Sequence, residues 1–453
     1  MSFESKRVLI AGIARSGIAA ARVLVKRGAV VSICDRKNQE QLNDRLLTEL
    51  DSLGVKIYTG SYPTVSRQDF DLLIASPGIP GDIEPFVQAR AAGIPIVGEL
   101  ELAYAIKNPE VEILAVTGTN GKTTTVSLLH SIMEADGRNS SVGGNIGVPL
   151  SAVVDQMSAG VIAVEVSSFQ LESIKDFRPH ICGILNITPD HLDRHKTLQA
   201  YTEVKGRIFT NQQADDFAVL NFDDPAIRGF ADFCPAQVVF FSVDQPLEKG
   251  ISVHDGIICA SDSAGIQQIC PVSHLLLRGK HNLENVLCAV GMALSAGVQP
   301  IVIARALSSF SGVRHRMEEA GVKNGVLYVN DSKATNPDSA IKALQSFDQD
   351  LILIAGGRNK GSSFSVLASY IKENAKALIL LGEAREEINQ AVIEVGFSGP
   401  ITIVNDLREA VRETCLLAQP GDVVLLSPAC ASWDQFDNYE QRGDLFCDLV
   451  KQM

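Results

Sequence analysis

The stretch "ILAVTGTNGKTTTVSLLHSIMEADG" (residues 113–137) constrains the fold of this chain more than any other segment. A short apolar run leads into a glycine-containing loop, and the residues after the loop place apolar side chains on one helical face: Val126, Leu129, Ile132 and Met133. Gly137 then supplies a helix stop. This order predicts a buried strand, a tight loop and a helix, which is the repeating unit of a parallel sheet covered by helices.

The loop "TGTNGKTT" (117–124) is a shortened form of the phosphate-loop pattern G-x-x-x-x-G-K-[ST], because Val116 occupies the position of the first glycine. Glycines let backbone N–H groups approach phosphate oxygens, and a helix N-terminus adds partial positive charge. Lys122 would reach the β- and γ-phosphate oxygens of a nucleotide, and the Thr123 hydroxyl could bind Mg²⁺. The alternative is a glycine-containing turn with a chance lysine.

Two further side chains could complete a metal site. Glu165 lies inside the apolar run "VIAVEVSS", where a carboxylate is costly unless it is paired or bound to a metal. His191, in "ITPDHLDRH", follows another apolar run. The alternatives are a Glu165 that is salt-bridged in the core and a helix start in which Thr188 is the cap and Pro189 the first helical residue.

The chain of 453 residues shows three regions, in each of which strand patterns alternate with helical patterns. We expect an α/β protein of three domains. These are an N-terminal Rossmann-like domain over residues 1–103, a central nucleotide-binding domain over 104–312 and a C-terminal Rossmann-like domain over 313–453. Residues 235–275 read as short strands and turns, with "HDG" a candidate hairpin.

The first region opens with "RVLIAGIARSG", a strand followed by a glycine turn and a helix. Ala14 stands where a dinucleotide fingerprint has its middle glycine, and Asp35 ends the second strand near the spacing for a ribose contact. The signal for NAD is weak. The pattern favours a shorter, differently placed diphosphate.

In the third region, loops follow the predicted strands: "NDSKATN", "GGRNKG" and "SPACASWDQF". Ligands of open α/β sheets bind at that edge, and Lys333 and Lys360 suit an anion there. Asn336 precedes Pro337 and has an obvious structural role as a helix N-cap.

Composition argues against several classes of protein. The net charge of -13 disfavours a nucleic-acid surface. Nine scattered cysteines without a C-x-x-C pair indicate free thiols in a reducing compartment. Because the N-terminus does not resemble a signal peptide and no apolar run reaches 18 residues, we expect a cytoplasmic protein without a membrane span.

Motifs across all three regions resemble the Mur ligases, bacterial enzymes that build the peptide stem of peptidoglycan. They are, in chain order, "TGTNGKTT", "GGNIG", "EVSSFQLE", "NITPDHLDRH", "YTEVKGRIF", "GKHNLENVLCA", "GVRHRME", "NDSKATNP" and "SPACASWDQFDNYEQRG". The third-region motifs are most similar to the members that add D-glutamate to UDP-N-acetylmuramoyl-L-alanine.

The resemblance implies that ATP phosphorylates the substrate carboxylate and that the amine of D-glutamate then attacks the acyl phosphate. Lys122 would neutralise the transferred phosphoryl group. Thr123 and Glu165 would hold one Mg²⁺, and His191 would help to hold a second. Lys205, in "EVKGRIF", matches the family lysine that reacts with CO₂ to form a carbamate, whereas without the resemblance it reads as a surface helix lysine.

The remaining site residues are also implied by the resemblance. The ATP contacts are Gly118, Thr119, Asn120, Gly121, Lys122, Thr123, Thr124, Asn282, Asn285, Arg316, Asp331 and Lys333. The UDP-substrate contacts are Gly12, Ala14, Arg15, Ser16, Asp35, Arg36, Ser76, Gly78, Asn145 and His195. The D-glutamate contacts are Thr335, Lys360, Ser427 and Phe436.

Departures from the family pattern are Arg314, in place of a more usual proline, and Trp433, in place of an aliphatic residue. Alternatives are a sister Mur ligase, a folylpolyglutamate-type ligase, a nucleotide-binding regulator without turnover and a nicotinamide dehydrogenase. We expect a monomer whose third region closes on its substrates and brings Arg316 and Lys333 to ATP.

Overall fold

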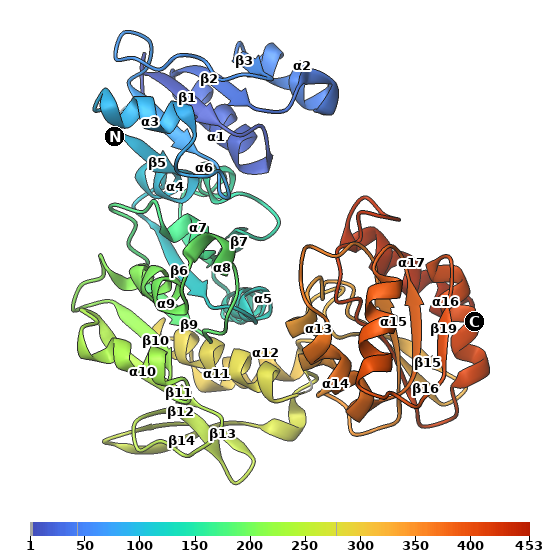
Figure 1. The fold of residues 1–453 in the computed structure, drawn as a ribbon. Helices are drawn as coiled ribbons and strands as arrows, with labels where there is room; N and C mark the ends of the chain where they lie inside the picture. The colour runs from blue at the N-terminus through green and yellow to red at the C-terminus, as the bar shows by residue number, and fades with distance from the viewer. Residues whose placement is uncertain (1–2, 43, 278) are drawn as a thin grey trace. The chain divides into compact units, whose positions relative to one another are not determined.

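The computed structural model describes residues 3–42, 44–277 and 279–453, and it contains three sheets with mainly parallel strands (Figure 1). The chain divides into two compact units. The larger unit comprises Met1–His274 and Glu284–Ser308, and the C-terminal unit comprises Leu275–Leu283 and Ser309–Met453. Within the described residues, no helix is long and apolar enough to cross a membrane.

The first sheet is fully parallel, with the strand order β3-β2-β1-β4-β5. Its strands are β1 (Arg7–Ala11), β2 (Val30–Asp35), β3 (Lys56–Thr59), β4 (Leu72–Ala75) and β5 (Ile96–Gly98). Its helices are α1 (Arg15–Lys26), α2 (Asp44–Ser52), α3 (Glu84–Ala91) and α4 (Glu99–Ile106). The strand order reverses between β1 and β4, and ligands of open α/β sheets commonly bind at such a point.

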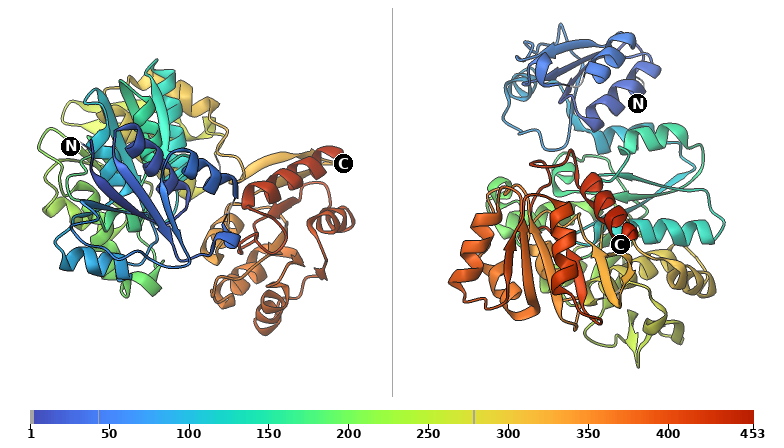
Figure 2. Two further views of the ribbon diagram at one scale, coloured as in Figure 1. Left: turned by 90° about the horizontal axis from the view of Figure 1, so that it is seen from above. Right: turned by 90° about the vertical axis from the view of Figure 1, so that its right-hand side faces the viewer.

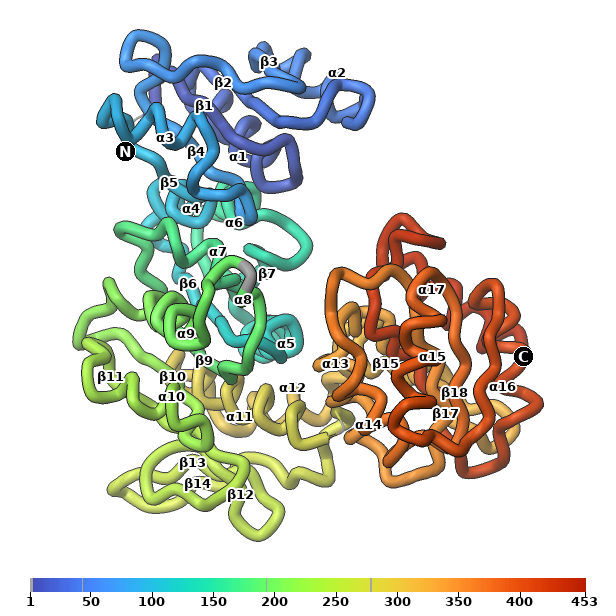
Figure 3. Tube along the Cα trace, in the orientation of Figure 1, coloured from blue at the N-terminus to red at the C-terminus, as the bar shows by residue number. Residues whose placement is uncertain are grey.

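The central sheet has the order β14-β13-β12-β11-β10-β9-β6-β8-β7. Its strands are β6 (Val111–Thr117), β7 (Ser140–Gly144), β8 (Gly160–Glu165), β9 (Ile181–Ile184), β10 (Phe217–Asn221), β11 (Gln237–Ser242), β12 (Gly250–His254), β13 (Ile257–Asp262) and β14 (Gly265–Pro271). Its helices are α5 (Lys122–Ala135), α6 (Leu150–Gln156), α7 (Ser168–Leu171), α8 (Leu192–His195), α9 (Leu198–Gly206), α10 (Pro225–Arg228), α11 (Lys280–Ser295) and α12 (Pro300–Ser309). The trace in Figure 3 shows the β12–β14 meander at one edge of this sheet.

The predicted hairpin is confirmed, because β12 and β13 pair antiparallel with His254 opposite Ile257. Asp255 and Gly256 form its turn with φ angles of 48° and 76°. Two successive left-handed residues are what a two-residue hairpin turn requires, and Asp-Gly is a preferred pair for it.

The third sheet has the order β15-β16-β20-β17-β18-β19, and helices cover both of its faces (Figure 2). Its strands are β15 (Glu318–Lys323), β16 (Val326–Asn330), β17 (Leu351–Gly356), β18 (Ala375–Leu381), β19 (Ile401–Ile403) and β20 (Val423–Leu426). Its helices are α13 (Pro337–Leu344), α14 (Ser365–Asn374), α15 (Arg385–Glu394), α16 (Leu407–Leu417) and α17 (Tyr439–Gln452). Strand β15 is antiparallel to β16 and lies at the sheet edge.

Two local expectations have different outcomes. The side chain of Asn336 accepts a hydrogen bond from the Ser339 N–H at 2.8 Å, so Asn336 is the N-cap of α13 as predicted. The alternative that places a helix start at Thr188 and Pro189 is wrong, because α8 begins at Leu192. Thr188 instead contacts the phosphate loop through its backbone.

Candidate active site

The loop between β6 and α5 is bounded by two glycines in conformations that other residues adopt with strain. Gly118 has φ 153° and Gly121 has φ 87°. A Cβ at Gly118 would lie 3.0 Å from Leu185, and one at Gly121 would lie 1.9 Å from Asn285 Oδ1. Val116 still pairs with Glu165 and with a neighbouring strand residue inside the sheet, so the loop begins later than the general pattern assumes.

The end of β9 supports this loop. The Thr119 N–H donates to the Asn186 backbone carbonyl, and the Asn120 N–H donates to Asn186 Oδ1, each at 2.8 Å. The Thr188 N–H donates to Thr119 Oγ1 at 3.0 Å. Sequence analysis missed Asn186 and Thr188 as loop supports, although a polar residue that ends an apolar run was a usable signal for Asn186.

Glu165, at the end of β8, lies beside the start of α5. The Thr123 hydroxyl donates to Glu165 Oε2 at 2.7 Å, and Asn145 Nδ2 donates to Glu165 Oε1 at 2.9 Å. Glu165 and Thr123 are both buried. The structure therefore brings together two predicted magnesium ligands and one predicted substrate contact. A hydroxyl group and an amide group each contact one oxygen of the Glu165 carboxylate.

Two lysines converge on one carbonyl of the loop. Lys122 Nζ donates to the Gly118 carbonyl at 2.8 Å, and Lys205 Nζ, from α9, donates to the same oxygen at 2.7 Å. Lys205 is 1% exposed and lies over the Tyr201 ring at 4.6 Å. Burial, and then the neighbouring charge of Lys122, hold the pKa of Lys205 well below its usual value. A surface lysine is excluded by this burial.

The two predicted histidines occupy different surroundings. His191 is half exposed, and its ring packs against Phe169 with the centroids 4.8 Å apart. His195 is buried, and its Nε2 lies 3.0 Å from Ser168 Oγ. Burial lowers the pKa of His195. His195 therefore belongs to a packed cluster, whereas the His191 side chain is half exposed to solvent.

In the first sheet, Asp35 supports the loop after β1. Its two carboxylate oxygens accept hydrogen bonds from the Ile13 N–H and the Lys37 N–H, each at 2.9 Å. Ser76, after β4, donates to the Gly12 carbonyl at 3.3 Å. The predicted contacts Ala14, Arg15, Ser16 and Arg36 are partly or fully exposed around this loop.

A cavity of about 150 Å³ lies beside this loop cluster. Ser76 and Gly78 line one side, and Glu172 and Arg194 line another. Arg194 donates to both carboxylate oxygens of Glu172, with its shortest contact at 2.6 Å. The cavity is thus bordered by the strand-end loop of the first sheet and by residues of the central domain.

In the C-terminal unit, the loops after β16 and β20 meet. The Ser427 hydroxyl donates to Asp331 Oδ2 at 2.8 Å, and the Met317 N–H donates to Asp331 Oδ1 at 3.3 Å. Burial raises the pKa of Asp331 to about 7 against the lowering effects of Ser427 and Arg316. The predicted ATP contact Asp331 and the predicted D-glutamate contact Ser427 are therefore direct neighbours.

Other predicted contacts of this unit cluster near the same strand ends. Lys360 Nζ lies 3.4 Å from Thr335 Oγ1. Lys333 Nζ lies over the Tyr439 ring at 5.4 Å. Phe436 is partly buried against the core face that α17 covers. Trp433, one of the departures, is 61% exposed on the loop after β20.

The two asparagines of α11 lie in different units. Asn285 Oδ1 lies against Gly121 in the larger unit, as the close approach above shows. Asn282 lines a cavity of about 550 Å³ in the C-terminal unit. Met317, Val329 and Phe347 are among the apolar residues that line that cavity.

The donor set of the central site suits Mg²⁺. The Glu165 carboxylate and the Thr123 hydroxyl are hard oxygen ligands. Among the residues that the structure describes, no group of three His, Cys, Asp or Glu side chains gathers to form an all-protein metal cage. Mg²⁺ commonly uses one or two protein ligands together with phosphate oxygens and water, so these residues fit the ion.

A glycine-bounded loop between a strand and a helix, with a lysine and a buried carboxylate beside it, defines a nucleotide-binding domain of the phosphate-loop class. Comparisons with known proteins specify the family. The Mur ligase MurD-like N-terminal domain matches residues 6–98, the Mur ligase middle domain matches 116–293, and the Mur ligase glutamate ligase domain matches 315–430. The chain belongs to the Mur ligase family.

Relatives named UDP-N-acetylmuramoylalanine–D-glutamate ligase align along the whole chain. The one from Pelotomaculum thermopropionicum is 47% identical over 99% of this chain and 98% of its own length. The one from Koribacter versatilis is 44% identical over 100% of this chain and 99% of its own length.

Solved structures share the fold. The MurC ligase of Thermotoga maritima has a TM-score of 0.61 at 20% identity, covering 99% of both chains. The MurF ligase of Thermotoga maritima, solved in complex with ADP, has a TM-score of 0.61 at 17% identity, covering 99% of this chain and 96% of that one. The expected three-domain α/β architecture is confirmed.

Proposed function

We propose that this chain joins D-glutamate to UDP-N-acetylmuramoyl-L-alanine at the expense of ATP, in the synthesis of peptidoglycan precursors. The observation that carries the proposal is the full-length similarity to ligases of that name. The site residues support it, because the phosphate-loop lysine, the buried carboxylate and the polar strand-end loops all occur in one chain. No specific observation favours a sister ligase, a folate-type ligase or a dehydrogenase.

The chain's own groups have distinct roles in this reaction. Backbone N–H groups at the start of α5 and the Lys122 ammonium would hold the ATP phosphates, and Lys122 would exchange its carbonyl contacts for phosphate oxygens. This stabilises the negative charge on the transferred phosphoryl group, because a positioned cation in a closed site needs no reorganisation. The buried oxygens of Thr123 and Glu165, which lie 2.7 Å apart beside the start of α5, support a metal site next to that phosphate.

Thr123 and Glu165 are the residues that would hold Mg²⁺, and His191 would contribute to a second ion. The bound metal supplies charge neutralisation on the phosphate oxygens. Lys205 is proposed to carry a carbamate, formed when its neutral amine adds CO₂ and loses a proton. Its burial beside the loop supports this proposal, because a buried amine is more easily neutral than a surface one.

The proposed contacts to the UDP-linked substrate and to D-glutamate lie in loops of the first and the third sheet. The loops with Gly12, Asp35 and Ser76 would hold the uridine diphosphate, where backbone N–H groups and a strand-end crevice meet. Thr335, Lys360, Ser427 and Phe436 would hold D-glutamate, whose two carboxylates require a cation and hydroxyl donors. The cavity that Asn282 lines would hold adenine.

The test is phosphate release by the purified protein with ATP, UDP-N-acetylmuramoyl-L-alanine and D-glutamate. We expect release only when all three are present, and we expect Lys122→Ala to lower the rate about 100- to 1,000-fold. Lys175→Ala, at an exposed lysine of the same domain, is the matched control and keeps the wild-type rate. Release that does not depend on D-glutamate, or full activity with another amino acid only, would contradict the proposal.

A further inference from the structure

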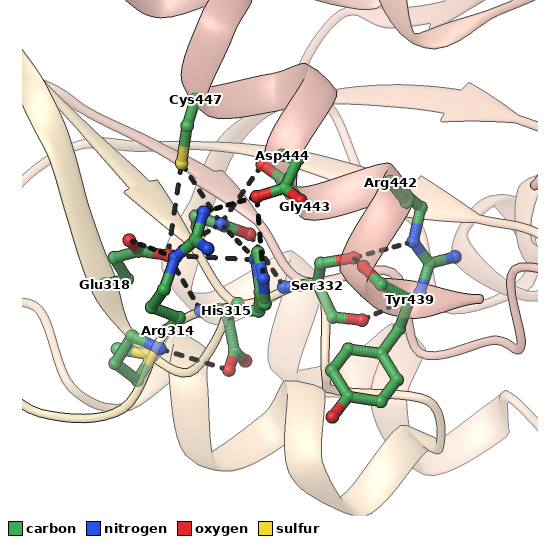
Figure 4. A network of polar contacts seen from close by, with 12 residues as sticks. Arg314, His315, Glu318, Ser332, Tyr439, Arg442, Gly443, Asp444 and Cys447 are labelled. Atoms are coloured by element: carbon green, nitrogen blue, oxygen red, sulfur yellow. Dashed lines mark hydrogen bonds and ion pairs between the residues drawn. The ribbon is translucent and has the colours of Figure 1, made fainter. Parts of the chain in front are cut away.

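Arg442, on the last helix α17, is a buried cation outside the predicted site. It is 2% exposed, and its guanidinium contacts two strand-end loops (Figure 4). Arg442 Nε donates to Ser332 Oγ at 2.9 Å, and Nη2 donates to the Ser332 carbonyl at 2.8 Å and to the Cys430 carbonyl at 3.2 Å. Sequence analysis included it in the family motif "SPACASWDQFDNYEQRG" but assigned it no role of its own.

The two contacted residues lie inside the segments that carry the proposed substrate contacts. Ser332 stands between Asp331 and Lys333, in the loop after β16. Cys430 follows Ser427 by three positions, in the loop after β20. Because β16 and β20 are neighbours in the sheet, one side chain spans the nucleotide side and the amino-acid side of the site.

The bonding geometry is specific to arginine. The oxygens that Arg442 binds are two carbonyls and one hydroxyl, so the contacts do not form an ion pair that a lysine could replace by charge alone. A planar guanidinium offers several donors in a fixed fork, whereas an ammonium is a single point. Burial lowers the pKa of Arg442 to about 10, which leaves the guanidinium charged at neutral pH.

The loops are joined at further points around this arginine. The Ser332 hydroxyl donates to the Tyr439 carbonyl at 2.8 Å, which ties the β16 loop to the first residue of α17. Arg358, after β17, exchanges two backbone hydrogen bonds with Ala431, at 2.8 and 3.0 Å. The hydrogen bond between Ser427 and Asp331 also joins the loop after β20 to the loop after β16.

The same helix also supports the turn that carries Arg316. Asn330 Nδ2 donates to the Gly443 carbonyl at 3.2 Å, and Arg314 pairs with Asp444 (Figure 4). The departure at Arg314 is thereby explained as a contact to α17. Helix α17 thus contacts the segments on both sides of β16.

We propose that Arg442 is a positioning residue for the ligase reaction, which fixes the separation of the loops after β16 and β20 so that the nucleotide and amino-acid contacts are held in register. This inference rests on the proposed function, which identifies the ligands as ATP and D-glutamate. A purely structural arginine would only stabilise the fold. A positioning arginine also sets the kinetic constants, because small displacements of positioned groups cost rate.

The experiment compares Arg442→Lys, Ser332→Ala and Phe446→Leu in the full chain. Phe446 is the matched control, because it is fully buried on the same helix and packs against Tyr328 in the core. Hydrogen exchange of the backbone amides in residues 331–335 and 429–433 reports directly on the loops. We expect faster exchange in both segments for Arg442→Lys and a smaller change for Ser332→Ala, while Phe446→Leu lowers the melting temperature without a selective change there.

Steady-state kinetics then test the consequence. We expect Arg442→Lys to lower kcat about 100-fold and to raise the KM for D-glutamate at temperatures where the variant is fully folded. Unchanged exchange in both segments, or wild-type kcat and KM in a variant whose loops do exchange faster, would overturn the positioning role. Failure of the wild-type protein to use D-glutamate would instead overturn the proposed function, and the exchange data would still decide whether Arg442 holds the loops.

Discussion

At the residue scale, Asp331 is a buried acidic group of the C-terminal unit. Its carboxyl group is buried, and it shares a hydrogen bond with Ser427. Burial raises its pKa to about 7, from an ordinary value of 3.8. In the folded protein the carboxyl group therefore keeps its proton over a pH range in which the unfolded chain has lost it.

This shift predicts a pH-dependent stability. The folded state binds more protons than the unfolded state between the two pKa values, so the contribution to stability is fully present below pH 3.8 and is lost as the pH rises through about 7. Asp331→Asn removes the titration, and the wild-type protein should lose at most about 4 kcal/mol relative to this variant between pH 4 and 8. Calorimetric unfolding of both proteins across that range is the measurement. If the free energies of unfolding of the wild-type protein and of Asp331→Asn changed in parallel with pH, Asp331 would not retain its proton in the folded state.

Residue patterns predicted part of the site. Thr123 and Glu165 could be paired in advance, because one follows the glycine–lysine step and the other is an acid in an apolar strand, and the structure places them 2.7 Å apart. Ser427 and Asp331 are separated by 96 positions, and Arg442 and Ser332 by 110. Contacts at such separations are created by the order of the strands, which no local pattern encodes.

At the scale of elements, a glycine with a left-handed backbone lies next to each end of α5. Gly121 and Gly137 have similar left-handed φ angles of 87° and 78°. A Cβ at Gly121 would lie 1.9 Å from Asn285 Oδ1, whereas a Cβ at Gly137 would meet nothing within 4 Å. Alanine would therefore have a similar unfavourable backbone conformation at both positions. Only at Gly121, in the phosphate loop, would its methyl group also overlap a neighbouring atom.

We expect Gly121→Ala to abolish nucleotide binding and to destabilise the protein by about 1–3 kcal/mol, because its left-handed backbone is strained with a side chain and the buried Asn285 side chain must shift to admit the methyl group. Gly137→Ala should cost about 1–2 kcal/mol through its backbone conformation and leave nucleotide affinity unchanged. Isothermal titration with ATP and denaturant unfolding separate the two effects. Equal affinities in the two variants would show that the loop tolerates a side chain.

The strands and helices that have strong apolar patterns were predictable, as β6, α5, β17 and β20 show. Strand β15 was missed, because its sequence "EEAGVK" is half charged and polar and its pairing with β16 is antiparallel at an edge. The short helix α8 begins three residues later than one alternative placed it, because the residues before it lie against the phosphate loop.

At the scale of the whole molecule, helix α11 is divided between the two compact units. Residues 280–283 of α11 group with the C-terminal unit, and residues 284–295 group with the larger unit. Asn282 and Asn285, one turn apart, thus lie on opposite sides of the division. The chain passes between the units at three points, His274–Leu275, Leu283–Glu284 and Ser308–Ser309, so any change in the relation of the units must be absorbed near these points.

Substrate binding should change the overall dimensions of the protein, because the proposed ATP contacts come from both units. Small-angle scattering with a non-hydrolysable ATP analogue and the UDP-linked substrate should differ from the profile of the free protein. Lys122→Ala, which weakens the phosphate contacts, serves as the control and should show a reduced difference. Superimposable profiles for the free and loaded wild-type protein would contradict this expectation.

The exposure of Trp433 has a practical consequence. It is the one tryptophan in the sequence, and it lies on the loop that follows Ser427. Ultraviolet emission excited at the red edge of the absorption band therefore originates from Trp433 alone, six residues after the proposed D-glutamate contact Ser427. The protein carries its own optical reporter of that loop, and titrations can be followed without attaching a dye.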